Sequence, residues 1–247
     1  TIDILEYLAT SGRGVGVAEL SAQMGVNRTS IYSILKMLAG KGYIRKVSEG
    51  RYSLTGRMFE YGQKFRNSFP IVHIARGLGN SLDLGYDCQL NVAMYFSGTS
   101  AVIMNSFRLK SPHSQDSDKI MLSGQTIPLY ATALGKMLLA HMLPLESKRV
   151  LEEIHFSPYT EHTICDIPTL KAQMEQIVAQ GYSMEENECF DNTFCFAAPV
   201  FDQTNTVTAA CSLSCSSFTP GINKKAVIQD ILSISRKLSR ALGATEI

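Results

Sequence analysis

The feature of this sequence that most constrains its fold is a patterned segment near its start, residues 27–38. Four aliphatic residues fall at positions i, i+3, i+4 and i+7, the spacing of one buried helix face: Ile31, Ile34, Leu35 and Leu38. Asn27 precedes them as a good N-terminal cap, and Gly25 stands where the chain needs a tight turn. The spacing therefore predicts a helix that packs on one side and leaves the other to solvent.

Shorter elements are predicted on both sides of this helix. Apolar spacing favours helices over about 2–9 and 17–24, and strand patterns follow at 44–47 and 51–54 around a Ser-Glu-Gly turn. Three short helices followed by a β-hairpin make a winged helix-turn-helix, in which the third helix enters the major groove of DNA. The alternative is a small helical domain whose polar face is merely solvated.

The free side of the third helix carries hydrogen-bond donors, an aromatic ring and two cations, and the hairpin adds further cations. From these two elements we predict the DNA-binding residues Arg28, Thr29, Ser30, Tyr32, Ser33, Lys36, Arg45 and Arg51. Residues 1–70 hold ten Lys/Arg and five Asp/Glu, a net charge of +5, whereas the whole chain carries only +1. A basic first quarter is typical of a nucleic-acid reader joined to another domain.

The composition excludes several classes of protein. Hydrophobic residues make up 45% and charged residues 18% of the 247 residues, as in folded globular domains. No apolar run reaches the ~18–20 residues of a membrane span and no secretory signal is visible, so we expect a cytoplasmic protein without membrane partners. Helical spacing begins almost at Thr1, so we also expect native residues to be missing before it.

The remainder of the chain has an α+β pattern. Strands are predicted at 90–96, 101–107, 182–188, 194–201 and 207–214, with a possible further strand at 121–123. Helices are predicted at 132–142, 145–153, 167–180 and 223–242. A mixed sheet flanked by helices indicates a sensor domain of the GAF-like fold.

Side chains alternate along the last predicted strand. Cys211, Leu213 and Cys215 share one face, whereas Ser212 and Ser214 share the other, about 7 Å apart. The serine face offers two hydroxyls to a polar ligand. The alternative is that both hydroxyls are satisfied within the sheet.

Both halves of the sequence resemble the isocitrate lyase regulator (IclR) family. The first half does so through residues 18–20, 25–35, 42–44 and 52–54, with Ser33 in place of a frequent arginine. The second half does so through residues 127–136 and the signature between Gly181 and Ser214. In the second half three residues depart from the family pattern: Tyr130 for histidine, Glu185 for Asp or Ser, and Phe196 for a small aliphatic.

The resemblance implies a domain arrangement and an effector site. It implies a DNA-binding domain over 1–56, a helical linker over 57–80 that contributes to dimer contacts, and an effector-binding domain over 81–247. The implied assembly is a dimer, or a tetramer of two dimers. Carried over residue by residue, the effector contacts are Gly124, Gln125, Glu185, Cys195, Ser212 and Ser214.

The sequence therefore predicts a transcription regulator, repressor or activator, whose binding to a double-stranded DNA operator responds to a small organic effector. A carboxylic acid is favoured, because loop amides and hydroxyls suit a carboxylate. The cysteines form no CxxC pair, so we expect no metal and no cofactor.

Two alternatives use the cysteines or histidines of the second half. One is a redox or metal sensor that uses Cys88, Cys165, Cys189, Cys195, Cys211 or Cys215. The other is an enzyme in which His141, His155 or His162 pairs with Cys165 or Cys195. No GxSxG, HExxH, Walker or GxGxxG motif accompanies these histidines, which argues against catalysis.

Overall fold

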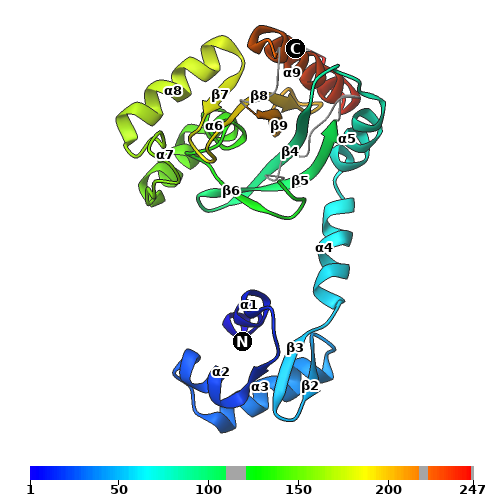
Figure 1. Ribbon diagram of the computed structural model, residues 1–247, viewed down its shortest axis with the longest axis vertical. Coiled ribbons are helices and arrows are strands. Elements are labelled where there is room, and N and C mark those ends of the chain that lie inside the picture. The colour runs from blue at the N-terminus through cyan, green and yellow to red at the C-terminus, as the bar shows by residue number, and fades with distance from the viewer. Residues whose placement is uncertain (110–120, 217–221, 246–247) are drawn as a thin grey trace. The chain divides into compact units, whose positions relative to one another are not determined.

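A computed structural model describes residues 1–109, 121–216 and 222–245. The chain divides into two compact units, Thr1–Ser68 and Phe69–Ile247 (Figure 1). The first unit has one hydrophobic core, and the second has two, one on each face of its sheet.

The first unit is the predicted winged helix-turn-helix. Its elements in chain order are α1 (Ile2–Ser11), β1 (Val15–Gly16), α2 (Val17–Met24), α3 (Arg28–Gly40), β2 (Ile44–Ser48), β3 (Arg51–Leu54) and α4 (Arg57–Asn67). The three strands pair antiparallel in the order β1-β3-β2. The sequence predicted the hairpin but not the two-residue strand β1, which is too short to show a periodic pattern.

The turn before α3 forms as the residues require. Gly25 adopts a left-handed conformation, φ 63°, which a residue with a Cβ rarely accepts. The Asn27 side chain accepts a hydrogen bond of 2.9 Å from the Ser30 amide and so caps α3. Ile31 and Leu35 are fully buried against α1 and α2, so the opposite side of α3 faces solvent.

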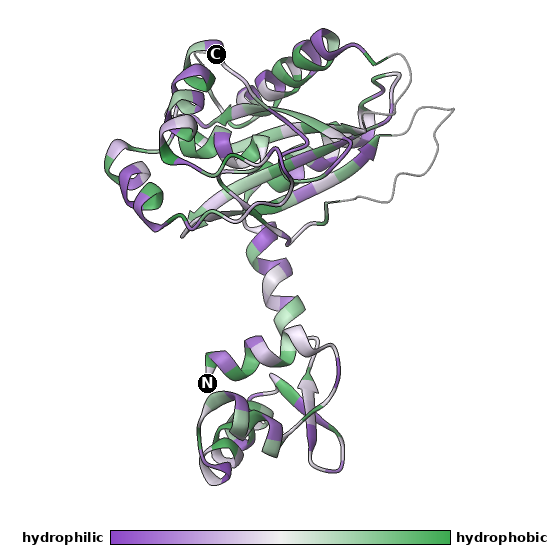
Figure 2. Ribbon diagram, turned by 60° about the vertical axis from the view of Figure 1, so that its left-hand side comes forward, coloured by the Kyte–Doolittle hydropathy of each residue, from purple (hydrophilic) through white to green (hydrophobic). Residues whose placement is uncertain are grey.

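Helix α4 buries none of its residues. Hydrophobic and hydrophilic bands alternate along it (Figure 2). Its large apolar side chains are exposed: Met58, Phe59, Tyr61 and Phe65. The next helix, α5 (Pro70–Ser81), instead packs Ile71, Val72 and Ala75 into a core of the second unit.

The second unit is built on one six-stranded sheet with every strand pair antiparallel, which confirms the α+β class. In sheet order the strands are β6 (Thr126–Pro128), β5 (Ser100–Leu109), β4 (Cys88–Ser97), β9 (Val207–Ser216), β8 (Thr193–Phe201) and β7 (Ser183–Glu186). The possible strand over 121–123 is wrong: the Gln89 side chain bonds both the amide and the carbonyl of Met121, and a turn follows at Ser123 and Gly124. The strand that pairs with β5 at this edge of the sheet is β6.

Helices cover both faces of this sheet (Figure 1). Helices α5 and α9 (Lys224–Ala241) pack on one face around Leu90, Phe196 and Leu213. The other face receives three further helices: α6 (Ala133–Ala140), α7 (Pro144–Glu153) and α8 (Ile167–Gln180). Each face therefore has its own apolar core.

A close approach positions α6 on this second face. A Cβ added to Gly135 would lie 2.4 Å from the Pro128 carbonyl oxygen and 2.6 Å from the Leu129 Cα, so only glycine fits. The Thr132 hydroxyl accepts from the Gly135 amide at 3.0 Å and caps the helix. These contacts bring the next residue, Lys136, beneath the sheet.

Candidate functional site

The predicted DNA-reading side chains lie on one exposed, basic surface of the first unit. Arg28, Thr29, Tyr32 and Lys36 are exposed along α3, and Tyr32 retains 55% of its accessible area. Residues 20–48 hold five Lys/Arg and no Asp/Glu. A helix whose solvent side offers cations, an aromatic ring and a hydroxyl, and no acid, suits a phosphate-lined groove.

Three of the predicted DNA-binding residues have partners within the unit. The Arg51 guanidinium donates to the Gly14 carbonyl at 2.6 Å and ties β3 to the loop before β1. The Ser33 hydroxyl donates to the Thr29 carbonyl at 3.2 Å, and the Ser30 backbone amide donates to the capping side chain of Asn27. Arg51 therefore supports the hairpin, whereas Arg28 and Lys36 of α3 and Arg45 of β2 are exposed cations without an ion-pair partner among the described residues.

In the second unit, the predicted effector residues of the sheet share one face. Glu185, Cys195, Ser214 and Gln89 are direct cross-strand neighbours on β7, β8, β9 and β4. Two residues along β9, Ser212 lies opposite Asn91. We call these six residues the polar row. Cys211, Leu213 and Cys215 point to the other face, as the predicted alternation requires.

The two predicted loop residues lie beside β5. Gly124 donates from its amide to the Ile103 carbonyl at 2.8 Å, and the Gln125 carbonyl accepts from the Ile103 amide at 2.9 Å. The Gln125 side chain accepts from the Leu122 amide at 3.2 Å. This loop is connected to the polar row through Gln89, which bonds Met121.

The polar row borders a buried ion pair that the sequence did not reveal. The Lys136 ammonium is fully buried and lies 2.6 Å from a Glu188 carboxylate oxygen and 2.9 Å from the Gln173 side-chain oxygen. Glu185 accepts from the Glu188 amide at 3.0 Å. Burial raises the pKa of both carboxyl groups, against the opposing effects of the Cys195 thiol on Glu185 and of Lys136 on Glu188.

Two polar groups of the row have hydrogen-bonding capacity to spare. The Ser106 hydroxyl accepts from Gln89 and donates to the Asn91 side-chain oxygen, which fixes the orientation of the amide. The Asn91 side-chain nitrogen is then buried without a partner in the described structure. The Ser212 hydroxyl, opposite it, makes no hydrogen bond with any described residue. Buried polar groups are normally satisfied, so an unpaired donor and hydroxyl side by side suit a polar ligand.

The sequence carried a signal for Gln89 and Asn91 that the prediction did not use. The two residues alternate with Cys88, Leu90 and Val92, as in a strand with one polar and one apolar face. Lys136 carried no such signal, because a lysine in a short helix normally faces solvent.

The buried thiols are poor nucleophiles. Burial raises the pKa of Cys195, and it raises that of Cys189 and of Cys211 to about 12. Such thiols stay protonated near neutral pH, which disfavours the alternatives that use these three cysteines. Within the described ranges no group of three His, Cys, Asp or Glu side chains is placed to hold a metal ion. No helix in those ranges is long and apolar enough to cross a membrane.

Comparison with protein families assigns both units. The IclR helix-turn-helix domain matches residues 1–48, and the bacterial transcriptional regulator IclR C-terminal domain matches residues 67–242. The chain belongs to the IclR family of bacterial transcription regulators. This family membership confirms the predicted DNA-binding, regulatory class, and the curated relatives are named as regulators and repressors, not as enzymes.

The relatives and solved structures span both units. The chain is 31% identical to the regulator KdgR of Escherichia coli over 211 residues, 82% of this chain and 75% of KdgR. It is 27% identical to the E. coli repressor YiaJ over 246 residues, 98% of this chain and 86% of YiaJ. Thermotoga maritima IclR superposes with a TM-score of 0.71 at 23% identity, covering 98% and 96% of the two chains. An IclR homologue from Microbacterium hydrocarbonoxydans, solved with 4-hydroxybenzoate, gives 0.69 at 15% identity, covering 94% and 92%.

Proposed function

We propose that this IclR-family regulator binds a DNA operator through α3. We propose further that its affinity for the operator falls or rises when a small organic acid binds at the polar row. The observation that carries the effector part is the unpaired Asn91 amide beside the Ser212 hydroxyl, both buried on the face that also holds Ser214 and Cys195. An oxygen atom of a bound ligand would accept hydrogen bonds from the Asn91 amide and the Ser212 hydroxyl.

The chemistry of the row favours a carboxylate over a neutral ligand. Asn91 and Ser212 offer two donors without partners, and the Ser214 hydroxyl, 2.9 Å from the Cys195 sulfur, lies beside them on the same face. A carboxylate has two oxygens that accept such bonds, and bonds to a charged acceptor are stronger than neutral ones. Gly124 and Gln125 are proposed as further contacts from the neighbouring loop. The Microbacterium homologue, which was solved with an aromatic acid, supports this class of ligand.

On DNA we propose a two-fold assembly. One recognition helix reads only a few base pairs, so two copies on two half-sites are needed for useful specificity. The exposed apolar side chains of α4 and the family resemblance support self-association through this region.

The test is a binding measurement on the full chain. Isothermal titration with 4-hydroxybenzoate should give saturable binding, and the neutral 4-hydroxybenzamide should bind at least about tenfold more weakly, since a charge-assisted bond is lost. Asn91→Leu, close in size, should abolish that binding while retaining affinity for a duplex selected from a random pool. Equal binding of both compounds would contradict the carboxylate assignment, and Asn91→Leu binding like the parent would remove the polar row from the site.

A further inference from the structure

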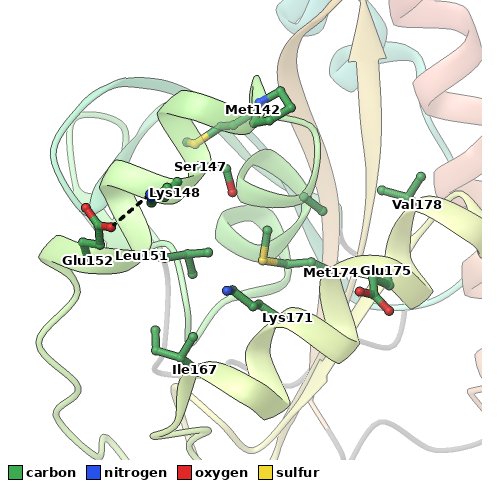
Figure 3. A pocket seen from close by; sticks show the side chains of 12 residues that line it. Met142, Ser147, Lys148, Leu151, Glu152, Ile167, Lys171, Met174, Glu175 and Val178 are labelled. Carbon is green, nitrogen blue, oxygen red and sulfur yellow. Dashed lines mark ion pairs between the residues drawn. The ribbon is translucent and has the colours of Figure 1, made fainter.

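A second hollow lies away from the polar row, between α7 and α8 (Figure 3). Its volume is about 910 Å³, within the range of small-ligand sites. Its walls are mainly apolar and are formed by Ala140, Met142, Leu151, Ile167, Met174 and Val178. It shares no residue with the polar row, so nothing said above about effector binding applies to it.

The wall of this hollow contains a hydroxyl with no partner. Ser147 is 9% exposed, and its hydroxyl makes no hydrogen bond with any residue of the described ranges. Figure 3 shows the Ser147 oxygen directed into the space between the two helices. A nearly buried hydroxyl without a protein partner indicates a ligand or solvent atom that completes it.

A lysine at the same hollow lacks a counter-charge. Lys171 lies within 4 Å of no carboxylate of the described structure, whereas Lys148 on the facing helix lies 3.9 Å from Glu152. Figure 3 shows the Lys171 ammonium extending toward Leu151 of α7. An apolar hollow with one unpaired cation favours a ligand that joins a hydrocarbon body to one negative charge.

We propose that the α7–α8 hollow is a second small-molecule site, for an amphiphilic monocarboxylate such as a medium-chain fatty acid. The hydrocarbon body lies against Met142, Leu151 and Met174, and the carboxylate accepts from Lys171 and Ser147. Two methionines suit a flexible chain, because their unbranched side chains adapt to irregular shapes. A small ligand is favoured over a macromolecule because the nearly buried Ser147 hydroxyl lines a concavity of ligand size, with the exposed Lys171 side chain also in its wall.

The experiment uses the full chain labelled with ¹³C at the methionine methyl groups, with octanoate as the probe. The methyl signals of Met142 and Met174 should shift and saturate. Octan-1-ol, which keeps the hydrocarbon body, should bind about tenfold more weakly, because the bond to Lys171 is charge-assisted. Lys171→Gln should weaken octanoate by a similar factor. Lys237→Gln, at an exposed position of α9 outside the hollow, is the matched control and should leave the affinity unchanged.

Three results would overturn the proposal. If octanoate shifts neither methyl signal, the hollow does not bind it. If octanol binds as tightly as octanoate, Lys171 does not bind the carboxylate. Signals that follow protein concentration and not octanoate would show that a second copy covers the hollow. The outcome is independent of the polar row, because Asn91→Leu should leave the octanoate response intact.

Discussion

The exposed face of α3 and the polar row of the sheet present functional groups in opposite ways. On α3, Tyr32 and Lys36 stand in solvent, while Ile31 and Leu35 on the other side hold the helix in its core. In the polar row, Glu185 and Ser212 are each 2% exposed and lie within the packed interior. The residues proposed to bind DNA are therefore distinct from those that stabilise the first unit, whereas the residues proposed to bind the effector lie within the packed interior of the second.

This difference sets what a substitution does. An exposed side chain whose contacts are only with a bound molecule can be removed with little effect on the free energy of unfolding. A buried polar side chain bonds other buried groups, and its removal leaves them without partners. The predictions below test this contrast between α3 and the polar row.

The largest expected effect is the loss of stability caused by Lys136→Met. This change leaves the Glu188 carboxylate buried without its ion-pair partner, and its second oxygen already has none among the described residues. Breaking a buried pair on one side typically costs about 3–5 kcal/mol of the free energy of unfolding. Urea unfolding measures it.

The control for this prediction removes both charges. Lys136→Met combined with Glu188→Leu should recover most of the loss, since two apolar residues of similar volume need no partner. If the free energy of unfolding of Lys136→Met lies within about 1 kcal/mol of that of the parent, the ion pair contributes no more than an exposed pair does. The contrast with α3 would then be wrong.

On α3 the expected change is in DNA binding alone. Tyr32→Ala should alter which sequence is preferred, by about 1–3 kcal/mol at the position it reads. Lys36→Ala should weaken binding to all sequences and reduce the salt dependence by about 0.9 log units per log unit of salt. Anisotropy titrations at several salt concentrations measure both.

Two controls accompany the α3 variants: the stability of the variants themselves, and the removal of an exposed lysine outside the first unit. The urea midpoints of both variants should match the parent, and Lys237→Ala on α9 should leave DNA binding unchanged. Arg51 is less suitable for this test, because its bond to the Gly14 carbonyl mixes hairpin stability with contact to DNA. Unchanged affinity, preference and salt slope in both α3 variants would remove this helix from the DNA interface.

Much of the fold could be predicted because local patterns report it. The stripe from Ile31 to Leu38, the Asn27 cap and the Gly25 turn each act within a few residues, so sequence spacing alone locates α3. The alternation along β9 likewise separates Ser212 from Cys211. The strand expected at 121–123 was wrong, because the side chain of Gln89, more than thirty residues earlier, takes up both backbone groups of Met121.

The candidate site was harder to predict because burial of charge is a tertiary property. Lys136 meets Glu188 only after α6 has packed against the sheet through Gly135, a pairing across fifty-two residues. Asn91 becomes unpaired only because the Ser106 hydroxyl, on the neighbouring strand, fixes its amide. No spacing within one element encodes either relation.

The pH dependence of stability tests the buried acid. Because burial raises the pKa of Glu185 in the folded state, folding favours its protonated form. The stability this adds is fully present below the ordinary pKa of about 4.5 and is lost as pH rises through the higher folded value. Glu185→Gln removes the titration but keeps the size, so its advantage over the parent should grow from acid to neutral pH, by less than the Lys136→Met loss.

The neighbouring acid provides the control for this titration. Glu186 is exposed and lies 2.7 Å from Lys224, so Glu186→Gln controls for the loss of one acid at an exposed position over the same range. Urea unfolding at several pH values gives both curves. Equal slopes for the two variants would mean that Glu185 titrates like a surface acid.

The smallest effects on stability are expected for two serines on the same buried face of the sheet, Ser183 on β7 and Ser212 on β9, with β8 between them. Ser183 is fully buried and donates to the Ala133 carbonyl at 2.6 Å, so Ser183→Ala should cost about 1 kcal/mol. The Ser212 hydroxyl has no such bond, so Ser212→Ala should cost about 0.5 kcal/mol or less. The order should reverse for 4-hydroxybenzoate, which Ser212→Ala should bind more weakly and Ser183→Ala unchanged. If Ser212→Ala instead destabilises as much as Ser183→Ala, with and without the acid, the Ser212 hydroxyl belongs to the sheet and not to a ligand site.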